Sequence, residues 1–132
     1  RMIREYKQNY NFVKIETLLE HPNEKVRKLA IEVLGDLKSQ ESILPLKKRY
    51  KEETYENSLE IVKALSKISN PKSIGFLQKV VDSEKDTNLQ IEAVKAIAEM
   101  GDEGKLYLEK MMKSDYKDYN IIIKHVLDKR IN

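Results

Sequence analysis

The chain has 132 residues, with 25 Lys and Arg against 22 Asp and Glu, and no Cys or Trp. At roughly 100–200 residues per domain, residues 1–132 should form a single domain. The absence of Cys excludes disulfides, thiolate catalysis and Cys-ligated metals. The net charge of +3 is too small to indicate a dedicated nucleic-acid or membrane-surface protein. An apolar content of 40% excludes a disordered chain, and the seven Gly and Pro residues in total favour regular structure.

An internal repeat of 31 residues runs along the chain. Its anchors are Ile15, Leu46, Leu77 and Leu108. Apolar residues recur three positions before most anchors and three or four positions after them, which is the spacing of one helix face. The pattern predicts four helices, called the A helices here, over 2–20, 41–52, 72–83 and 103–114.

A second helix is predicted after each A helix. Small or aliphatic residues align between the first three copies: Ala30, Ile61 and Ala93 at one position, and Leu34, Leu65 and Ile97 at another. The fourth copy is weaker and fits through Ile123 and Val126 if its loop is one residue shorter. These B helices are expected over 24–38, 55–69, 87–100 and 117–130. Four hairpins would then span 2–38, 41–69, 72–100 and 103–130.

Local signals support these boundaries. Asn70 precedes a proline and predicts an N-cap with proline in the first turn. Thr87, with a glutamine three residues later, predicts a capping box. Gly101 predicts a helix end, with Asp102 as the next N-cap. Pro45 falls within the second A helix and predicts a late start or a kink there.

Stacking is needed because one hairpin alone cannot bury the apolar stripes of both its helices. We therefore expect an all-α fold, a right-handed α-α superhelix (α-solenoid) of about four hairpins.

The first B helix and the turn before it carry a family resemblance. Between His21 and Leu37, a turn is followed by Val-Arg, an alanine four residues after the valine, Leu-Gly and a closing leucine. This resembles the HEAT-repeat family, most closely the short bacterial HEAT-like repeats of the phycobilisome-lyase type. The resemblance implies a curved scaffold that binds other proteins. Its A helices would line the convex face and its B helices the concave face.

The sequence carries no recognisable catalytic set. His21 precedes a proline and His125 a valine, so neither forms the His-Glu pair of the metal-dependent hydroxylases built from HEAT-like repeats. The acidic residues are dispersed, with no paired arrangement for general acid–base chemistry. We predict that the chain is not an enzyme and holds no cofactor or metal.

The best binding candidates lie on the expected concave ridge of the B helices. They are Lys63, Lys67 and Lys95, His125 in the last repeat, and the flanking acids Glu32, Asp36 and Glu99. This pattern predicts a groove for an acidic or mixed-charge peptide, in which charge complementarity tunes specificity and association rate. The other interpretation is solubilising charge on an exposed helix face. Arg27, near one edge, is expected to pair with an acid and brace the stack.

The predicted function is therefore a non-catalytic protein-interaction scaffold in the cytoplasm, whose partner is another protein or a peptide. Two alternatives stay open. One is a lyase-like or other enzyme accessory subunit that binds a small cofactor. The other is a weak nucleic-acid binder, which the balanced charge and the lack of Trp disfavour.

The densest basic cluster lies at residues 47–51. Within it, Arg49 takes a core-aligned position, so its aliphatic part should pack against the core while its guanidinium group extends into water.

The two ends of the array raise further expectations. Tyr6 and Tyr10 lie four residues apart and predict a stripe that caps the array or contacts another subunit. The aliphatic run at residues 121–123 is too short to span a membrane, and its three side chains cannot all face one way, so one should be exposed. Because the chain begins with a basic segment at Arg1, a membrane anchor upstream of it stays open. The sequence does not predict the partner's identity or the oligomeric state.

Overall fold

The computed structural model describes residues 12–83, 86–113 and 118–131, and all regular structure within these ranges is helical. The α-helices are α2 (Glu24–Asp36), α3 (Ile43–Tyr50), α4 (Tyr55–Ile68), α5 (Ile74–Ser83), α6 (Thr87–Ala98), α7 (Gly101–Met112) and α8 (Asp118–Ile131). The 3₁₀ helices are η1 (Leu18–Glu20), η2 (Gln40–Ser42) and η3 (Pro71–Ser73). Residues 12–17 form a helix that runs into η1. None of the helices in these ranges is long and apolar enough to cross a membrane.

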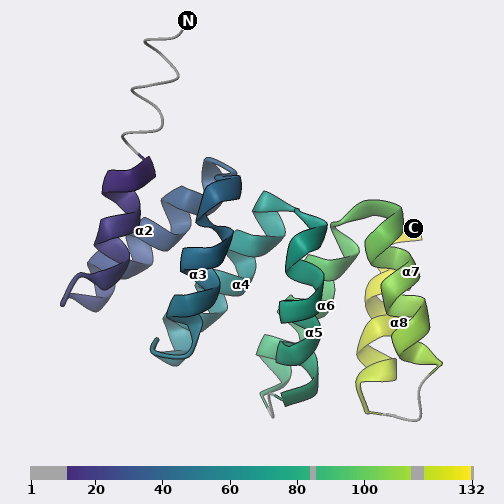
Figure 1. Ribbon diagram of the computed structural model, residues 1–132. Coiled ribbons are helices and arrows are strands. Elements are labelled where there is room, and N and C mark those ends of the chain that lie inside the picture. The colour runs from purple at the N-terminus through teal and green to yellow at the C-terminus, as the bar shows by residue number, and fades with distance from the viewer. Residues whose placement is uncertain (1–11, 84–85, 114–117, 132) are drawn as a thin grey trace, which may run out of the picture.

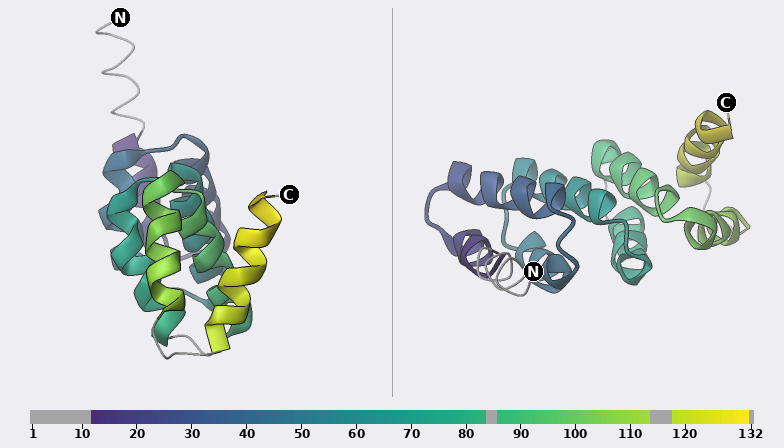
Figure 2. Two further views of the ribbon diagram at one scale, coloured as in Figure 1. Left: turned by 90° about the vertical axis from the view of Figure 1, so that its right-hand side faces the viewer. Right: turned by 90° about the horizontal axis from the view of Figure 1, so that it is seen from above.

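The helices stack side by side in two rows (Figure 1). The A row holds residues 12–20, α3, α5 and α7, whereas the B row holds α2, α4 and α6, with α8 following at the C-terminal end (Figure 2). Each B helix contacts the next one, and α3, α5 and α7 each pack on the B helix that follows them. This is the all-α solenoid that the repeat predicts. The Tyr6–Tyr10 stripe lies outside the described residues.

The core follows the predicted register. At the anchor of the A helices, Leu46, Leu77 and Leu108 are fully buried; at the aligned B position, Leu34, Leu65 and Ile97 are fully buried. The predicted core positions of the weaker fourth copy are also confirmed, because Ile123 is fully buried and Val126 is 5% exposed. Each such side chain contributes about 1.5–3 kcal/mol through its burial.

One predicted helix cap is confirmed and another is wrong by one residue. Asn70 Oδ1 accepts a hydrogen bond from the Lys72 N–H at 2.9 Å, as a capping residue before proline should. Helix α6 is capped by Asp86, not Thr87, and the Asp86 carboxylate accepts the Leu89 N–H at 3.0 Å. A carboxylate is favoured over a hydroxyl there because its negative charge interacts with the positive end of the helix dipole.

The proline and glycine signals are largely confirmed. Helix α3 begins at Ile43, later than predicted, and Pro45 therefore lies in its first turn, where the missing N–H breaks no helical hydrogen bond. Gly101 has a φ of 68°, the left-handed conformation expected after a helix end. Asp102 is not a cap, however, because α7 already begins at Gly101 and Asp102 lies in its first turn.

Helices α2 and α4 lie in close contact at Gly35. A Cβ atom added to Gly35 would lie 2.8 Å from Ala64 Cα and 2.9 Å from Ala64 Cβ. These distances are shorter than van der Waals contact, so any larger residue at position 35 would push the two helices apart. The missing side chain therefore sets the spacing of the first two B helices.

We expect Gly35→Ala to lower the free energy of unfolding by about 1–3 kcal/mol, because the new methyl group overpacks the contact with Ala64. Gly75→Ala is the matched control, since nothing lies within 4 Å of a Cβ at that helical position. Its effect should be neutral or stabilising, by up to about 1 kcal/mol. Urea denaturation of both variants measures the difference, and equal midpoints would contradict this packing.

Candidate functional site

An open groove of about 1140 Å³ runs along the B helices, and all four of them contribute to its lining. Its lining residues with ionisable side chains are Asp36, Lys38, Lys67, Glu92, Lys95, Glu99, His125 and Lys129. Its uncharged lining residues are Gly35, Ser66, Ser69, Ile91, Ile121, Ile122 and Val126. Since consecutive hairpins supply these residues, the groove exists only in the stacked array. Helix α8, offset on the B side of α7 (Figure 2), contributes five of these residues, from Ile121 to Lys129.

The structure brings five of the seven predicted binding residues into this groove. They are Asp36, Lys67, Lys95, Glu99 and His125. The other two, Lys63 and Glu32, are not part of the lining. Lys63 instead lies 3.9 Å from Glu60 on its own helix.

Two lysines of the groove have acidic residues beside them. Lys67 Nζ donates to Asp36 Oδ1 at 2.6 Å, a contact that joins α2 to α4 and raises the pKa of Lys67. Lys95 Nζ lies 3.8 Å from Glu92 Oε1, one turn earlier on α6. The groove therefore presents paired charges of both signs rather than a uniformly basic surface.

Apolar side chains from α6 and α8 form the other part of the lining. Ile121 is 75% exposed and Ile122 is half-buried, whereas Ile123 is fully buried in the core. The expected exposure of one isoleucine in this run is thus confirmed. Sequence reasoning did not assign Ile121, Ile122 or Ile91 to the groove. The break in the helical stripe at 121–123 was the signal that could have placed the first two there.

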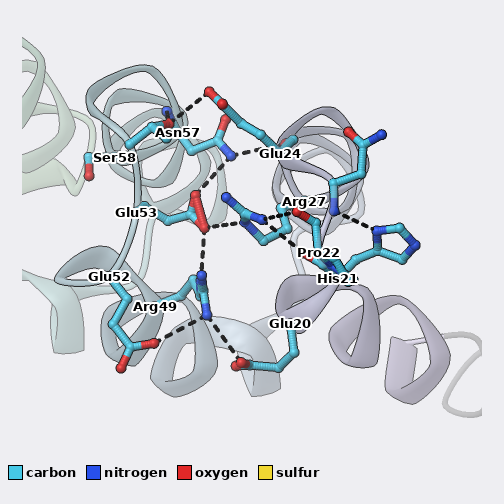
Figure 3. A network of polar contacts seen from close by, with 12 residues as sticks. Glu20, His21, Pro22, Glu24, Arg27, Arg49, Glu52, Glu53, Asn57 and Ser58 are labelled. Carbon is cyan, nitrogen blue, oxygen red and sulfur yellow. Dashed lines mark hydrogen bonds and ion pairs between the residues drawn. The ribbon is translucent and has the colours of Figure 1, made fainter.

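A buried carboxylate links the first two repeats at the edge formed by the loops (Figure 3). The Glu53 side chain is fully buried. Its Oε1 accepts hydrogen bonds from Arg27 Nε at 2.6 Å and Arg49 Nε at 2.8 Å, and its Oε2 accepts one from Asn57 Nδ2 at 2.8 Å. Arg27 also donates to the carbonyl oxygen of His21 at 2.8 Å. The expected pairing of Arg27 with an acid is confirmed, and it joins the first repeat to the second.

The charge of Glu53 is stabilised by its donors. Burial alone would raise the pKa of the Glu53 carboxyl, but the hydrogen bonds from Arg49, Asn57 and Arg27 outweigh burial and hold this pKa below its ordinary value. The same pairing raises the pKa of Arg49. This site therefore serves stability, because both carboxylate oxygens accept hydrogen bonds from neighbouring side chains.

A second groove, of about 1100 Å³, lies along the loop edge of the second and third repeats. Its lysines are Lys47, Lys48, Lys51 and Lys79. Tyr50 and Phe76 also line it, and their rings meet edge to face with centroids 5.3 Å apart. Arg49 differs from its expected position, since its side chain is only 13% exposed and binds Glu53 instead of extending into water.

The histidines show no ligand arrangement. His21 Nδ1 accepts a hydrogen bond from the Asn23 N–H at 3.0 Å within its turn, whereas His125 is exposed on α8. Within the described ranges, no group of three or more His, Asp or Glu residues is placed to hold a metal ion.

We expect Glu53→Gln to lower the free energy of unfolding at pH 7 by about 3 kcal/mol, because it leaves two largely buried guanidinium groups without their counter-charge. The folded-state pKa of Glu53 is depressed. Its ionised form therefore stabilises the fold above the unfolded pKa of about 4.3, and this contribution is lost as the pH falls through the folded pKa. When the pH is lowered from 7 to below about 5, the free energy of unfolding measured by urea denaturation should therefore fall less for the variant than for the wild type.

Glu52→Gln is the control, because the Glu52 side chain is 71% exposed and contacts the same arginine, Arg49, at 3.2 Å. It should lower the free energy of unfolding at pH 7 by less than about 1 kcal/mol. Its stability should also fall at low pH as much as that of the wild type, because Glu53 is still present. Glu56, whose pKa is lowered by Lys28, titrates in all three proteins alike. Wild-type stability of Glu53→Gln at pH 7 would rule out the bracing role.

Comparison with known proteins gives one family. A sequence model of HEAT repeats matches residues 14–98, which is more than half of the chain. No curated protein matches the chain. The match covers the first three hairpins, including the α2, α4 and α6 portion of the groove. The chain belongs to the HEAT-repeat family.

Proposed function

We propose that this chain is a non-catalytic scaffold that binds a segment of a partner protein in the groove along its B helices. HEAT repeats generally mediate protein–protein interactions and are typically non-catalytic. The observation that carries the proposal is the single groove to which α2, α4, α6 and α8 all contribute. A groove built by successive repeats offers an extended surface, which suits a peptide segment.

The chemistry of the groove specifies the kind of segment. Lys67 and Lys95 already have acidic neighbours, at 2.6 Å and 3.8 Å, so a purely acidic ligand would compete with Asp36 and Glu92 for them. Ile121 is exposed, so covering it with an apolar side chain of the ligand makes the free energy of binding more favourable. The best ligand is therefore a peptide with apolar anchors between charged residues of both signs, whose charges align it in the groove.

Two simple measurements distinguish this function from the two alternative functions. A small-cofactor accessory subunit would be purified with a bound ligand, visible by absorbance or native mass spectrometry. A nucleic-acid binder would use the lysines of the second groove, and its association constant would fall steeply with salt. Binding to a mixed-charge peptide with apolar anchors should change only modestly with salt, since much of it comes from apolar contact.

The test is a random-peptide display selection on the wild-type protein, followed by anisotropy titration of the enriched peptides. Lys95→Glu should weaken binding at least about tenfold, because it reverses a charge in the groove. Lys63→Glu is the matched control and should leave binding within about twofold. Both lysines lie near a glutamate three residues earlier, at 3.8 Å and 3.9 Å, but only Lys95 lines the groove.

A second pair of variants tests the apolar part. Ile121→Asp should abolish binding, whereas Leu44→Asp should not, because Leu44 is an exposed aliphatic residue on α3 outside the groove, at 59% exposure against 75% for Ile121. If the enriched peptides bind Lys95→Glu and Ile121→Asp as well as they bind the wild type, the groove is not their site. If no peptide is enriched, the proposed ligand class is wrong.

A further inference from the structure

The second groove differs from the groove along the B helices in its charge balance. It lies where the C-terminal ends of α3 and α5 reach the same edge of the array (Figure 1). The lysines that line it are Lys47, Lys48, Lys51 and Lys79. All of them except Lys47 are exposed. Among the described residues, none of the four forms an ion pair with an acid, in contrast to Lys67 and Lys95 in the other groove.

The acids that line the second groove do not balance these lysines. Glu53 is one of them, but its buried carboxylate is already paired with Arg27 at 2.6 Å and Arg49 at 2.8 Å. The other is the exposed Asp82. Residues 84–85, which the structure does not describe, are a glutamate and a lysine of opposite charge. The groove therefore presents positive charge that its own lining does not compensate.

An exposed tyrosine gives the second groove an apolar contact surface at a fixed position. Tyr55 lines the groove and is 47% exposed, and its hydroxyl donates to the Asp86 carboxylate at 3.0 Å. Because Asp86 also caps α6, this hydrogen bond ties the ring to the third repeat. The same position in the neighbouring repeats holds Glu24 and Asp86, so the ring is particular to this groove. A ring held in this way can cover an apolar side chain at a low cost in conformational entropy.

We propose that the second groove is a separate docking site, which binds an acidic segment of a partner protein with an apolar side chain between its carboxylates. The carboxylates pair with Lys48, Lys51 and Lys79, and the apolar side chain packs on Tyr55. Complementary charge of this kind speeds association and aligns the segment in the groove. The site shares no lining residue with the groove along the B helices and does not depend on it.

The lining of the second groove suits a peptide better than a nucleic acid. A nucleic acid carries a phosphate on every nucleotide, so its backbone would bring negative charge beside Asp82. The rings of Tyr50 and Phe76 meet at 90°, so together they form no flat platform for stacked bases. A peptide can place a neutral residue beside Asp82 and its carboxylates beside the lysines.

The test is a random-peptide display selection on the wild-type protein, with counter-selection on the double variant Lys48→Glu/Lys79→Glu. Peptides that bind the wild type but not this variant should carry a net negative charge and an aromatic or aliphatic residue between their acids. In anisotropy titrations the variant should bind these peptides at least about tenfold more weakly, because two exposed charges of the groove are reversed.

The matched control is Lys105→Glu/Lys110→Glu, which changes the net charge by the same amount. Both lysines are exposed on α7, and neither lines the second groove. Lys110 is the counterpart of Lys48 and Lys79 in the fourth repeat, at the same spacing of 31 residues. The control should bind the acidic peptides within about twofold of the wild type, since salt screens distant exposed charges.

Two variants of Tyr55 test the apolar contact. Tyr55→Ala should weaken binding of the acidic peptides at least about fivefold, because it removes the ring on which the apolar side chain packs. Tyr55→Phe keeps the ring and should bind within about threefold of the wild type. Circular dichroism checks that every variant is folded.

The proposal is overturned if no peptide depends on Lys48 and Lys79, or if the peptides that do are not acidic. A labelled oligothymidine strand that binds the wild type more tightly than the selected peptides, and that Lys48→Glu/Lys79→Glu releases, would assign the groove to nucleic acid instead. Lys95→Glu separates this proposal from the proposed function. It should weaken peptides of the groove along the B helices, whereas the acidic peptides should bind it like the wild type.

Discussion

The close contact between Gly35 and Ala64 fixes the geometry on which the other features of the B row depend. Because Gly35 has no side chain, α4 can lie directly against α2. This spacing lets Lys67 on α4 reach Asp36 on α2 at 2.6 Å, and it places both residues in the same groove. The groove is thus a consequence of helix packing. A change in the spacing would alter the core and the binding surface together.

The loop edge is held by a different kind of contact. A buried carboxylate is costly unless it is paired and hydrogen-bonded. Glu53 meets this condition because Arg27 comes from the first repeat and Arg49 from its own. Other polar contacts also join neighbouring repeats, such as Tyr55 Oη to Asp86 at 3.0 Å. These contacts span about one repeat length, so stability propagates between neighbours, as in other solenoids.

The sequence predicted the parts of the structure that repeat. Aliphatic spacing identified Leu65 and its counterparts as core because burial of one helix face leaves a periodic signal. The cap at Thr87 was assigned one residue late because two adjacent residues could both act as the N-cap. In the structure the carboxylate of Asp86 accepts the backbone hydrogen bond. Membership of the groove was harder to predict. Lys63 and Lys95 look equivalent in sequence, but only Lys95 lines the groove, because a groove depends on the three-dimensional arrangement of several repeats and leaves no periodic signal.

Function in such an array is therefore found where the repeats differ. Lys63 and Lys95 have the same kind of acidic neighbour, yet only Lys95 lines the groove together with the exposed Ile121. Leu29 likewise stands out against Glu60 at the same position one repeat later. Residues that match the repeat maintain the stack, and their identity says little about partners. The residues that break it are the ones free to be selected for binding, and the proposed groove depends on such residues.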